Sequence, residues 1–320
     1  MPLFSIVIPL FNKARWIGRA IESVIAQEFE DFELIIVDDG STDESIAVVT
    51  QFEDSRISLL RQPNRGPSAA RNKGAAHARG EWIALLDADD YWLDGHLEAL
   101  AQLMRTRPEC GVVTCNWWNE DLDGRRNEAN RFASQSDSSV EDYFEFVVSG
   151  RGPLLNSSSV AIRKDVLDAA GGFDEGLRLA EDVELWCRLT MRTSFAAYHR
   201  PMAVYYQDFS GNSTRDRLYV GDAPFSSLRD GFSEDRLGYF DQYLASWRMK
   251  SLALGTLLAG QKSLVRRMAL ESLGSMVWPR SIVFIVLSFL PTAVCKGLYV
   301  AYRRLTGRAW MPSLLNVAGN

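Results

Sequence analysis

Three carboxylates stand within four residues at Asp87-Ala88-Asp89-Asp90, directly after the apolar run Trp82–Leu86. Carboxylates this close repel one another and lose hydration unless a cation neutralises them. Mg²⁺ and Mn²⁺ take oxygen ligands, often one or two carboxylates, and complete their shell with phosphate and water. The chemistry open to this motif is therefore metal-assisted binding of a diphosphate. Taken alone, so short a motif is more typical of a solvated loop whose aspartate caps the next helix.

Two further acidic clusters have residue types suited to binding or catalysis. Asp38-Asp39-Gly40-Ser41 follows the apolar run Phe32–Val37, and an aspartate there can accept the N–H of a pyrimidine ring. Glu181-Asp182 begins a predicted helix, where one of the two acids could act as a general base toward a hydroxyl. Each cluster also has a structural interpretation, because turns often contain DDGS and a helix N-terminus favours acids.

The elements that would position these acids alternate between strand and helix. Short apolar, β-branched runs predict buried strands at Phe4–Pro9, Phe32–Val37, Ile57–Leu60, Trp82–Leu86 and Ser157–Ile162. Helices are predicted after Asn12, which can act as a cap, from Gly66 through Ala78, and over Glu181–Met191. This alternation predicts a parallel, doubly wound sheet. Ligands of such sheets bind beyond the carboxyl ends of the strands, where Asp38-Asp39 and Asp87–Asp90 stand.

The chain of 320 residues is 47% hydrophobic and 24% charged, which suits one large domain or one and a half. A net charge of −6 argues against nucleic acid as a partner. Four cysteines without CxxC spacing are predicted to be reduced and structural, as in a cytosolic protein. The first residues lack the basic segment and cleavage site of a secretory signal.

The charge is unevenly distributed along the chain. Leu244–Trp310 holds ten basic residues and one acid, a net charge of +9, which leaves −15 for the remainder. A basic, apolar tail on an acidic body predicts contact with an anionic membrane surface. Ser281–Tyr302 is strongly apolar but contains Pro291 and Lys296, so interfacial or hairpin-like attachment is favoured over a full span. The alternative is a buried helical pair packed on the body.

Three segments carry a family resemblance, in this order: SIVIPLFN, ESVIAQEFEDFELIIVDDGSTDES and NRGPSAARNKGAAHARGEWIALLDADD. Together they resemble the family 2 glycosyltransferases of the GT-A fold, from about Phe4 to Tyr206. The resemblance implies an α/β fold with a Rossmann-like, mostly parallel sheet flanked by helices over residues 1–220. A helical, basic and apolar C-terminal region at 221–320 lies outside the resemblance, and the body is expected to end near Asp216–Pro224.

The resemblance also implies roles for single residues around the donor. Pro9 would line the nucleotide pocket, and Asp39 would hold the base of a uridine donor. Arg71 would contact the nucleotide, with a helix-surface salt bridge as the alternative. Asp89 would be the direct metal ligand, while Asp87 would lie near the ribose or reach the metal through water.

Further roles implied by the resemblance concern the acceptor side. Asp182 would be the catalytic base, supported by Glu181, and Asp90 would orient the site. Trp186, one helical turn later, would stack on an acceptor sugar, although core packing is an equal alternative. The chain departs from the family at Phe209, where many relatives have a histidine that helps bind the metal. Either Asp208 replaces it as an oxygen ligand, or metal binding depends mainly on Asp89 and phosphate.

The expected function is inverting transfer of a sugar from a nucleotide diphosphate, a UDP-sugar being favoured, to an acceptor hydroxyl with Mn²⁺ or Mg²⁺. Cell-surface polysaccharide or lipid-linked glycan synthesis is expected, with the protein cytoplasmic and peripheral at the inner face of the cell membrane. A nucleotidyltransferase would need a Gly-rich basic loop after the first strand, where this chain has Pro9-Leu10-Phe11-Asn12-Lys13. A degenerate sugar- or nucleotide-binding module is the third alternative, disfavoured because Asp39, Asp89 and Asp182 occur together.

Overall fold

The computed structural model describes residues 1–130, 139–149, 151–177, 180–206, 228–251, 253–258, 260–273 and 278–298. The chain forms two compact units. The first contains Met1–Phe146 and Arg151–Gln207, and the second includes the helices α9 to α12. Because all the predicted site residues described by the structure lie in the first unit, that unit is treated first.

One half of the sheet in the first unit is parallel, as the alternation of elements predicts. The strands β1 (Phe4–Leu10), β2 (Phe32–Asp38), β3 (Ile57–Arg61) and β4 (Trp82–Leu85) lie in the order β3-β2-β1-β4. All three neighbouring pairs are parallel. Almost every residue of β1 and β2 is buried, because helices cover both faces of such a sheet. The four strands confirm the predicted runs to within one or two residues.

The other half of the sheet is mixed, which differs from a mostly parallel sheet. β9 (Val160–Arg163) runs antiparallel between β4 and β6 (Cys110–Glu120). β10 (Ser194–Tyr206) pairs parallel with β6 and antiparallel with β5 (Tyr91–Trp92). The short strands β7 (Arg126–Glu128) and β8 (Ser139–Glu141) complete it. Two reversals across β9 restore the direction of β4, so β6 and β10 end at the same edge as β1, β2 and β4.

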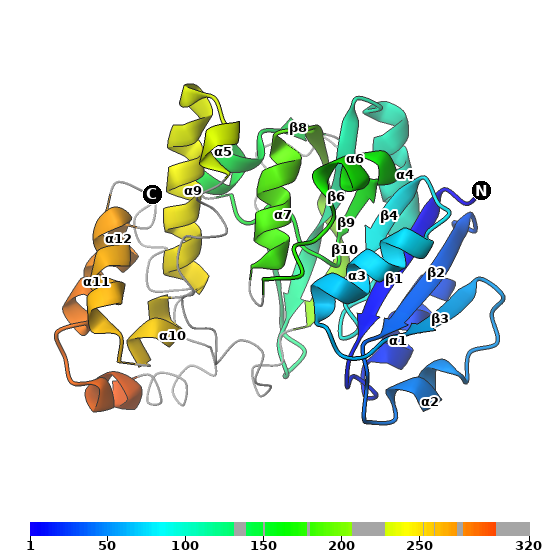
Figure 1. Ribbon diagram of the computed structural model, residues 1–320, viewed down its shortest axis with the longest axis horizontal. Helices are drawn as coiled ribbons and strands as arrows, with labels where there is room; N and C mark the ends of the chain where they lie inside the picture. Colours follow the sequence, from blue (N-terminus) through cyan, green and yellow to red (C-terminus); the bar gives the residue numbers. More distant parts are fainter. Residues whose placement is uncertain are drawn as a thin grey trace. The chain divides into compact units, whose positions relative to one another are not determined.

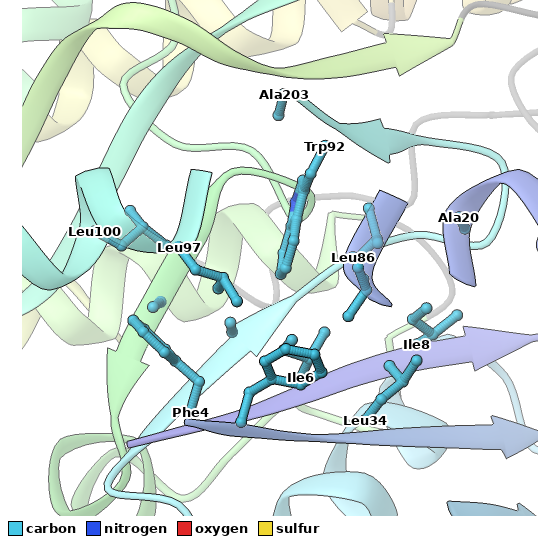
Figure 2. Packing of buried hydrophobic residues seen from close by; sticks show 14 of the residues in the cluster. Phe4, Ile6, Ile8, Ala20, Leu34, Leu86, Trp92, Leu97, Leu100 and Ala203 are labelled. Atoms are coloured by element: carbon cyan, nitrogen blue, oxygen red, sulfur yellow. The ribbon is translucent and has the colours of Figure 1, made fainter. Parts of the chain in front are cut away.

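Helices cover both faces of this sheet (Figure 1). Successive residues of β1 point to opposite faces. Phe4, Ile6 and Ile8 join the main core cluster together with residues of α1 (Ile17–Ile25) and α4 (His96–Thr106), as Figure 2 shows. On the opposite face, α3 (Pro67–His77) packs on β1 and β2. The first unit also contains α2 (Ser45–Val49), α6 (Lys164–Ala170) and α7 (Glu181–Thr190), and α5 (Tyr143–Val148) begins in it, with its last two residues in the second unit.

The second unit is helical in its described residues. It contains α9 (Glu234–Ser251), α10 (Ala253–Leu258), α11 (Lys262–Glu271) and α12 (Trp278–Leu287), with a short 3-10 turn at Arg229–Gly231. Helical structure was predicted for this region. None of the helices in the described parts of the chain combines the length and the apolar composition needed to cross a membrane. The predicted boundary at Asp216–Pro224 and the last part of 281–302 lie outside the described residues.

The four cysteines are free and buried, as their spacing predicts. Burial raises the pKa of Cys110 to about 11, and it raises the pKa of Cys115 and of Cys187 as well. These thiols therefore serve the packing of the sheet and of α7 rather than any nucleophilic chemistry.

Candidate active site

One edge of the sheet gathers the acidic clusters predicted from the sequence. The carboxyl ends of β1, β2 and β4 meet there because the strands are parallel and in register. β9 runs in the opposite direction, so the segment before it, with Ser158, arrives at the same edge. The side chain of Ser158 accepts the backbone N–H of Asp87 at 3.0 Å. This is the edge where ligands of open α/β sheets bind.

Arg71 on α3 connects two of the acidic clusters. Its Nη2 lies 2.7 Å from Asp87 Oδ1, and its Nη1 lies 3.3 Å from Glu181 Oε1. The side chain of Arg71 is 5% exposed, so this is a buried ion-pair bridge and not a helix-surface salt bridge. Burial alone would lower the pKa of Arg71, but the carboxylates of Asp87 and Glu181 outweigh it and raise that pKa. Through Arg71 the loop after β4 and the start of α7 belong to one charged network.

Asp182 lies beside this network, on the first turn of α7. Its Oδ1 accepts the N–H of Val183 at 2.7 Å. Burial and then the charge of Glu181 raise its pKa to about 6, and Arg71 opposes the shift. The charge of Asp87 contributes in the same direction as Glu181, which places Asp182 within electrostatic reach of the β4 end. A carboxyl group with a pKa near neutrality is suited to accept a proton from an attacking hydroxyl.

Asp89 forms an ion pair with a lysine side chain, a contact that the sequence did not predict. Lys13 Nζ, from the loop after β1, lies 2.5 Å from Asp89 Oδ2. Arg19 Nη2 on α1 donates to the main-chain oxygen of Asp89 at 2.8 Å. The side chain of Asp89 is 28% exposed, so solvent reaches the carboxylate from the side that Lys13 leaves open.

Asp90 is fully buried and faces the opposite way, into the protein. Its two oxygens accept from Ser158 Oγ at 2.5 Å and from the N–H of Tyr206 at 2.8 Å. Burial, followed by the charges of Asp89 and Asp87, raises the pKa of Asp90 well above its ordinary value. Asp90 therefore ties the end of β10 and the segment before β9 to the loop after β4, and its orienting role stays a prediction.

Asp39 organises the loop that leads into α3. Its Oδ1 accepts from Gln62 Nε2 at 2.8 Å and from the N–H of Arg65 at 2.9 Å, while its Oδ2 accepts from the N–H of Gly66 at 2.8 Å. Its side chain is buried. A carboxylate oxygen can accept two hydrogen bonds, so Oδ2 keeps one acceptor position. Recognition of a nucleotide base by Asp39 stays a prediction, as does the role of the partly buried Pro9 on β1.

The loops after β1 and β2 are joined by side-chain hydrogen bonds. Asn12 has a left-handed backbone (φ 51°), its N–H donates to Ser41 Oγ, and its Oδ1 accepts the N–H of Thr42 at 2.8 Å. The prediction that Asn12 caps the following helix is therefore wrong. Helix α1 begins only at Ile17, and Trp16 before it makes no side-chain cap. Asparagine tolerates the left-handed region, which explains the residue at this position.

The side-chain oxygens at this edge suit a metal ion that is bound partly by the protein and partly by a substrate. Among the described residues, no three His, Cys, Asp or Glu side chains form a ready-made metal cage. Asp87 and Asp89 instead offer carboxylate oxygens at the end of one strand, and their charges act on Asp90. Mg²⁺ and Mn²⁺ are commonly held by one or two carboxylates together with phosphate and water. The residues present therefore fit such an ion.

Comparison with known proteins decides the family. Residues 5–167, just over half of the 320-residue chain, match the family model described as Glycosyl transferase family 2. This chain belongs to glycosyl transferase family 2. An uncharacterized glycosyltransferase from Nostoc sp. is 34% identical over 169 residues, covering 51% of this chain and 52% of that protein. Glycosyltransferase GlyG of Streptococcus pneumoniae is 35% identical over 122 residues, covering 37% and 40%.

This chain spans only about half the length of the curated relatives that it matches. For the uncharacterized glycosyltransferase EpsJ of Bacillus subtilis, the match covers 54% of the relative at 32% identity. Among solved structures, S. aureus TarS 1–349 superposes with a TM-score of 0.61 and 17% identity, covering 96% of this chain and 93% of that one. A structure of TarS 1–349 in complex with UDP-GlcNAc superposes with a TM-score of 0.62. This similarity confirms the GT-A fold.

Trp186 does not take the predicted acceptor-stacking position. Its side chain is 2% exposed and packs edge-on against Phe173 with ring centroids 6.5 Å apart. A ring so buried presents no face to a sugar, so the stacking prediction is wrong and the core-packing alternative holds. The helical spacing from Asp182 placed Trp186 near the site but could not tell the outer face of α7 from the inner one.

Other residues at the edge were missed from the sequence. Arg19 lies over the ring of Tyr91 at 4.2 Å, and Tyr91 donates to Glu120 Oε2 at 3.0 Å. These contacts, like the bond between Lys13 and Asp89, join segments far apart in the chain. Nothing in the local sequence signals them, apart from a lysine and an arginine that closely follow the first strand. Asp208 and Phe209, the position of the expected histidine, lie outside the described residues.

Proposed function

We propose that this chain is an inverting glycosyltransferase that moves a sugar from a nucleotide diphosphate donor, a UDP-sugar being favoured, onto an acceptor hydroxyl. The observation that carries the proposal is the buried Arg71 bridge, which links Asp87 of the β4 end to Glu181 at the start of α7. The bridge brings the donor-side carboxylates and the candidate base Asp182 into one network. The UDP-GlcNAc complex of the structurally similar TarS 1–349 supports the choice of donor class.

The donor would be held at the edge formed by β1, β2 and β4. Asp39 and Pro9 would receive the nucleotide, and Asp89, with Asp87 nearby, would hold a divalent cation. When bound, Mn²⁺ or Mg²⁺ supplies positive charge to the departing diphosphate. Arg71 keeps Asp87 in place, and Arg19 fixes the backbone of Asp89, so the carboxylates are positioned before the donor arrives. Such preorganisation avoids the cost of ordering the site during the reaction.

The acceptor step depends on Asp182. Its carboxylate accepts the hydroxyl proton while the hydroxyl oxygen bonds to the anomeric carbon. The bond from that carbon to the diphosphate oxygen breaks on the opposite face, and the diphosphate leaves with the electron pair. One base without a second nucleophilic carboxylate implies inversion, by the geometric logic of inverting glycosidases. Glu181 helps to hold Asp182 ready, because its charge contributes to the raised pKa of that carboxyl group.

A ligand-binding screen tests the donor assignment. UDP-, GDP- and dTDP-sugars are added with Mn²⁺, and the melting temperature is measured, since a ligand that binds the folded state raises it by mass action. We expect a UDP-sugar to give the largest shift and Asp89→Ala to abolish it. Asp94→Ala, which removes the same group from an exposed position five residues away, should leave the shift intact. An equal shift in wild type and Asp89→Ala would refute the role of Asp89.

We also infer that the C-terminal helices attach to an anionic membrane surface at the inner face of the cell membrane. There the enzyme would serve cell-surface polysaccharide or lipid-linked glycan synthesis. In the described residues, α12 and the turn after it expose an apolar stripe of Ile282, Val286 and Phe289, which are 45%, 58% and 70% exposed. These positions recur at helical spacing and so share one face. Arg266 lies over the Phe289 ring at 5.0 Å, which places a cation beside the stripe.

Within the described residues of the second unit, α12 packs on α11 and the stripe stays uncovered. An apolar face flanked by basic residues is the pattern of a helix that lies in the membrane interface. The net charge of +9 over Leu244–Trp310 adds electrostatic attraction to anionic lipid.

A further inference from the structure

Asp87 and Asp89, the two carboxylates after β4, each form an ion pair with a different basic side chain. The two basic side chains differ in how tightly the protein holds them. Asp87 is paired with Arg71, whose side chain is 5% exposed and is also bound to Glu181. Asp89 is paired with Lys13, whose side chain is 36% exposed and makes no second ion pair within the described residues. Arg71 is therefore a fixed part of the network, whereas the ammonium group of Lys13 is open to solvent and to a ligand.

The main chain of Lys13 is held firmly while its side chain is not. Its N–H donates to Ser45 Oγ at 2.9 Å, and its carbonyl oxygen accepts from the N–H groups of Trp16 and Ile17 at 2.8 and 3.0 Å. Ser45 is in turn held by Asp43. Lysine carries its charge on a flexible four-carbon stem. The loop thus fixes the position from which the ammonium group can swing without any backbone rearrangement.

A divalent cation and Lys13 compete for the same oxygen. The ammonium nitrogen of Lys13 lies 2.5 Å from Asp89 Oδ2, so a metal ion that uses this oxygen would share it with a second cation, and like charges repel each other. The diphosphate that completes the metal shell brings negative oxygens to the same place. An ammonium group displaced from Asp89 then has a new acceptor within its reach.

We propose that Lys13 is an exchangeable counterion, which pairs with Asp89 in the absence of donor and transfers to the donor diphosphate when metal and donor bind. This role rests on the proposed function and adds a diphosphate-binding residue to it. It also explains how the partly exposed carboxylate of Asp89 is neutralised between turnovers. Charge-assisted bonds to phosphate are among the strong hydrogen bonds, so the transferred contact favours donor retention and stabilises the departing diphosphate.

The exchange predicts effects of opposite sign on two ligands. Lys13→Gln removes the competitor for Asp89, so Mn²⁺ alone should bind about two- to fivefold more tightly, as expected for loss of an exposed ion pair. The same variant lacks the contact to phosphate, so a nucleoside diphosphate in saturating Mn²⁺ should bind about tenfold more weakly. A merely structural role for Lys13 would move both affinities in the same direction or neither.

The test is a pair of calorimetric titrations on the full chain, with Mn²⁺ alone and with a nucleoside diphosphate in saturating Mn²⁺. The nucleotide is whichever of UDP, GDP and dTDP the wild type binds most tightly. Arg15→Gln is the matched control, because Arg15 is exposed in the same loop and lies over the Trp16 ring, 4.4 Å from its centroid. It should leave both affinities within about twofold. Lys13→Arg, which keeps the charge, should restore most of the nucleotide affinity.

The outcomes distinguish failure of the Lys13 exchange from failure of the proposed glycosyltransferase function. If Lys13→Gln binds the nucleotide as wild type does, or binds Mn²⁺ more weakly than wild type, the exchange is overturned while the glycosyltransferase assignment stands. If wild type binds none of the three nucleotides in Mn²⁺, both proposals fall. Opposite shifts in Lys13→Gln, absent from Arg15→Gln, would establish the exchange.

Discussion

At the scale of single residues, Asp182 differs from the other acids of the site in its burial, its partners and its pKa. Asp90 is fully buried and both its oxygens accept hydrogen bonds from the protein. Asp87 and Asp89 are paired with Arg71 and Lys13. Asp182 is only partly buried and, among the described residues, accepts one hydrogen bond, from the N–H of Val183. Burial and the charge of Glu181 raise its pKa to about 6. It is the carboxyl group best placed to exchange a proton with a substrate.

The raised pKa of Asp182 predicts a pH dependence of turnover. A general base must be ionised, so the rate should fall as the pH drops below about 6, by roughly tenfold per pH unit, because the protonated fraction grows. The sign follows from the direction of the shift: burial favours the neutral form, so ionisation needs a higher pH than for an ordinary aspartate. The measurement is release of nucleoside diphosphate from a saturating nucleotide sugar between pH 5 and 8.

Donor affinity measured at the same pH values is the control, since it separates loss of the base from loss of donor binding. A rate that stays constant from pH 7.5 down to pH 5 would contradict a catalytic role for a carboxyl group with this pKa.

The residue scale also shows what the sequence could predict of the site. The sequence singles out Asp39, Asp87, Asp89 and Asp182 because each stands at the end of an apolar run or at the start of a periodic one. Their partners were not, since the bond from Lys13 to Asp89 spans 76 positions and the bond from Ser158 to Asp90 spans 68. Such pairs depend on which strands become neighbours in the sheet, and a local pattern carries no record of that.

At the scale of elements, hydrophobic patterning predicted the parallel half of the sheet closely. Runs such as Phe32–Val37 are buried on both faces, which leaves a continuous apolar signal. The mixed half was harder to predict. The sequence predicts a strand over Ser157–Ile162, but β9 begins only at Val160, after a turn, and its antiparallel pairing with β4 and β6 depends on tertiary neighbours. The start of α1 was placed too early, because Asn12 suits a left-handed turn as well as a helix cap.

The packing of α3 against β1 gives a prediction at this scale. A Cβ atom at Gly74 would overlap the side chain of Val7, whose branched side chain has little freedom to move aside. Alanine is the better helix former by about 1 kcal/mol, but overpacking costs about 1–3 kcal/mol. Gly74→Ala should therefore lower the free energy of unfolding. Chemical denaturation followed by circular dichroism measures the change.

Gly18 on α1 is the matched control. A Cβ atom there would lie 3.5 Å from Val48 Cγ1, an ordinary contact, so Gly18→Ala should be neutral or stabilising. If Gly74→Ala proves as stable as Gly18→Ala, then α3 does not approach β1 as closely as the structure has it.

At the scale of the whole molecule, charge and exposed apolar surface change along the chain together. The basic segment Leu244–Trp310 was visible in the composition. What the composition could not show is which apolar residues face outward. In the described residues of the second unit, Val286 and Phe289 are exposed on or next to α12 while Phe284 and Leu287 are buried. Which of these residues are buried depends on how α12 packs on α11, and the spacing of apolar residues in the sequence does not predict that packing.

Vesicle binding tests the membrane proposal. The full chain should sediment with vesicles that contain anionic phospholipid, bind neutral vesicles less, and lose affinity as salt rises, because the attraction is screened. Phe289→Gln should weaken binding by about tenfold, since a buried phenylalanine contributes roughly 1.5–3 kcal/mol. Leu122→Gln, at a position 53% exposed in the first unit, should have no effect. Equal binding to neutral and anionic vesicles would contradict the charge-based part of the proposal.

The most direct test of the account replaces the candidate base and leaves the donor edge unchanged. Asp182→Asn keeps the size of the side chain but removes its ability to take a proton. We expect its donor affinity in Mn²⁺ to match that of wild type, and its release of nucleoside diphosphate from a saturating donor to fall by at least about 100-fold. A variant that turns over at close to the wild-type rate would show that the proton is removed elsewhere, and the assignment of this edge as the catalytic centre would fail.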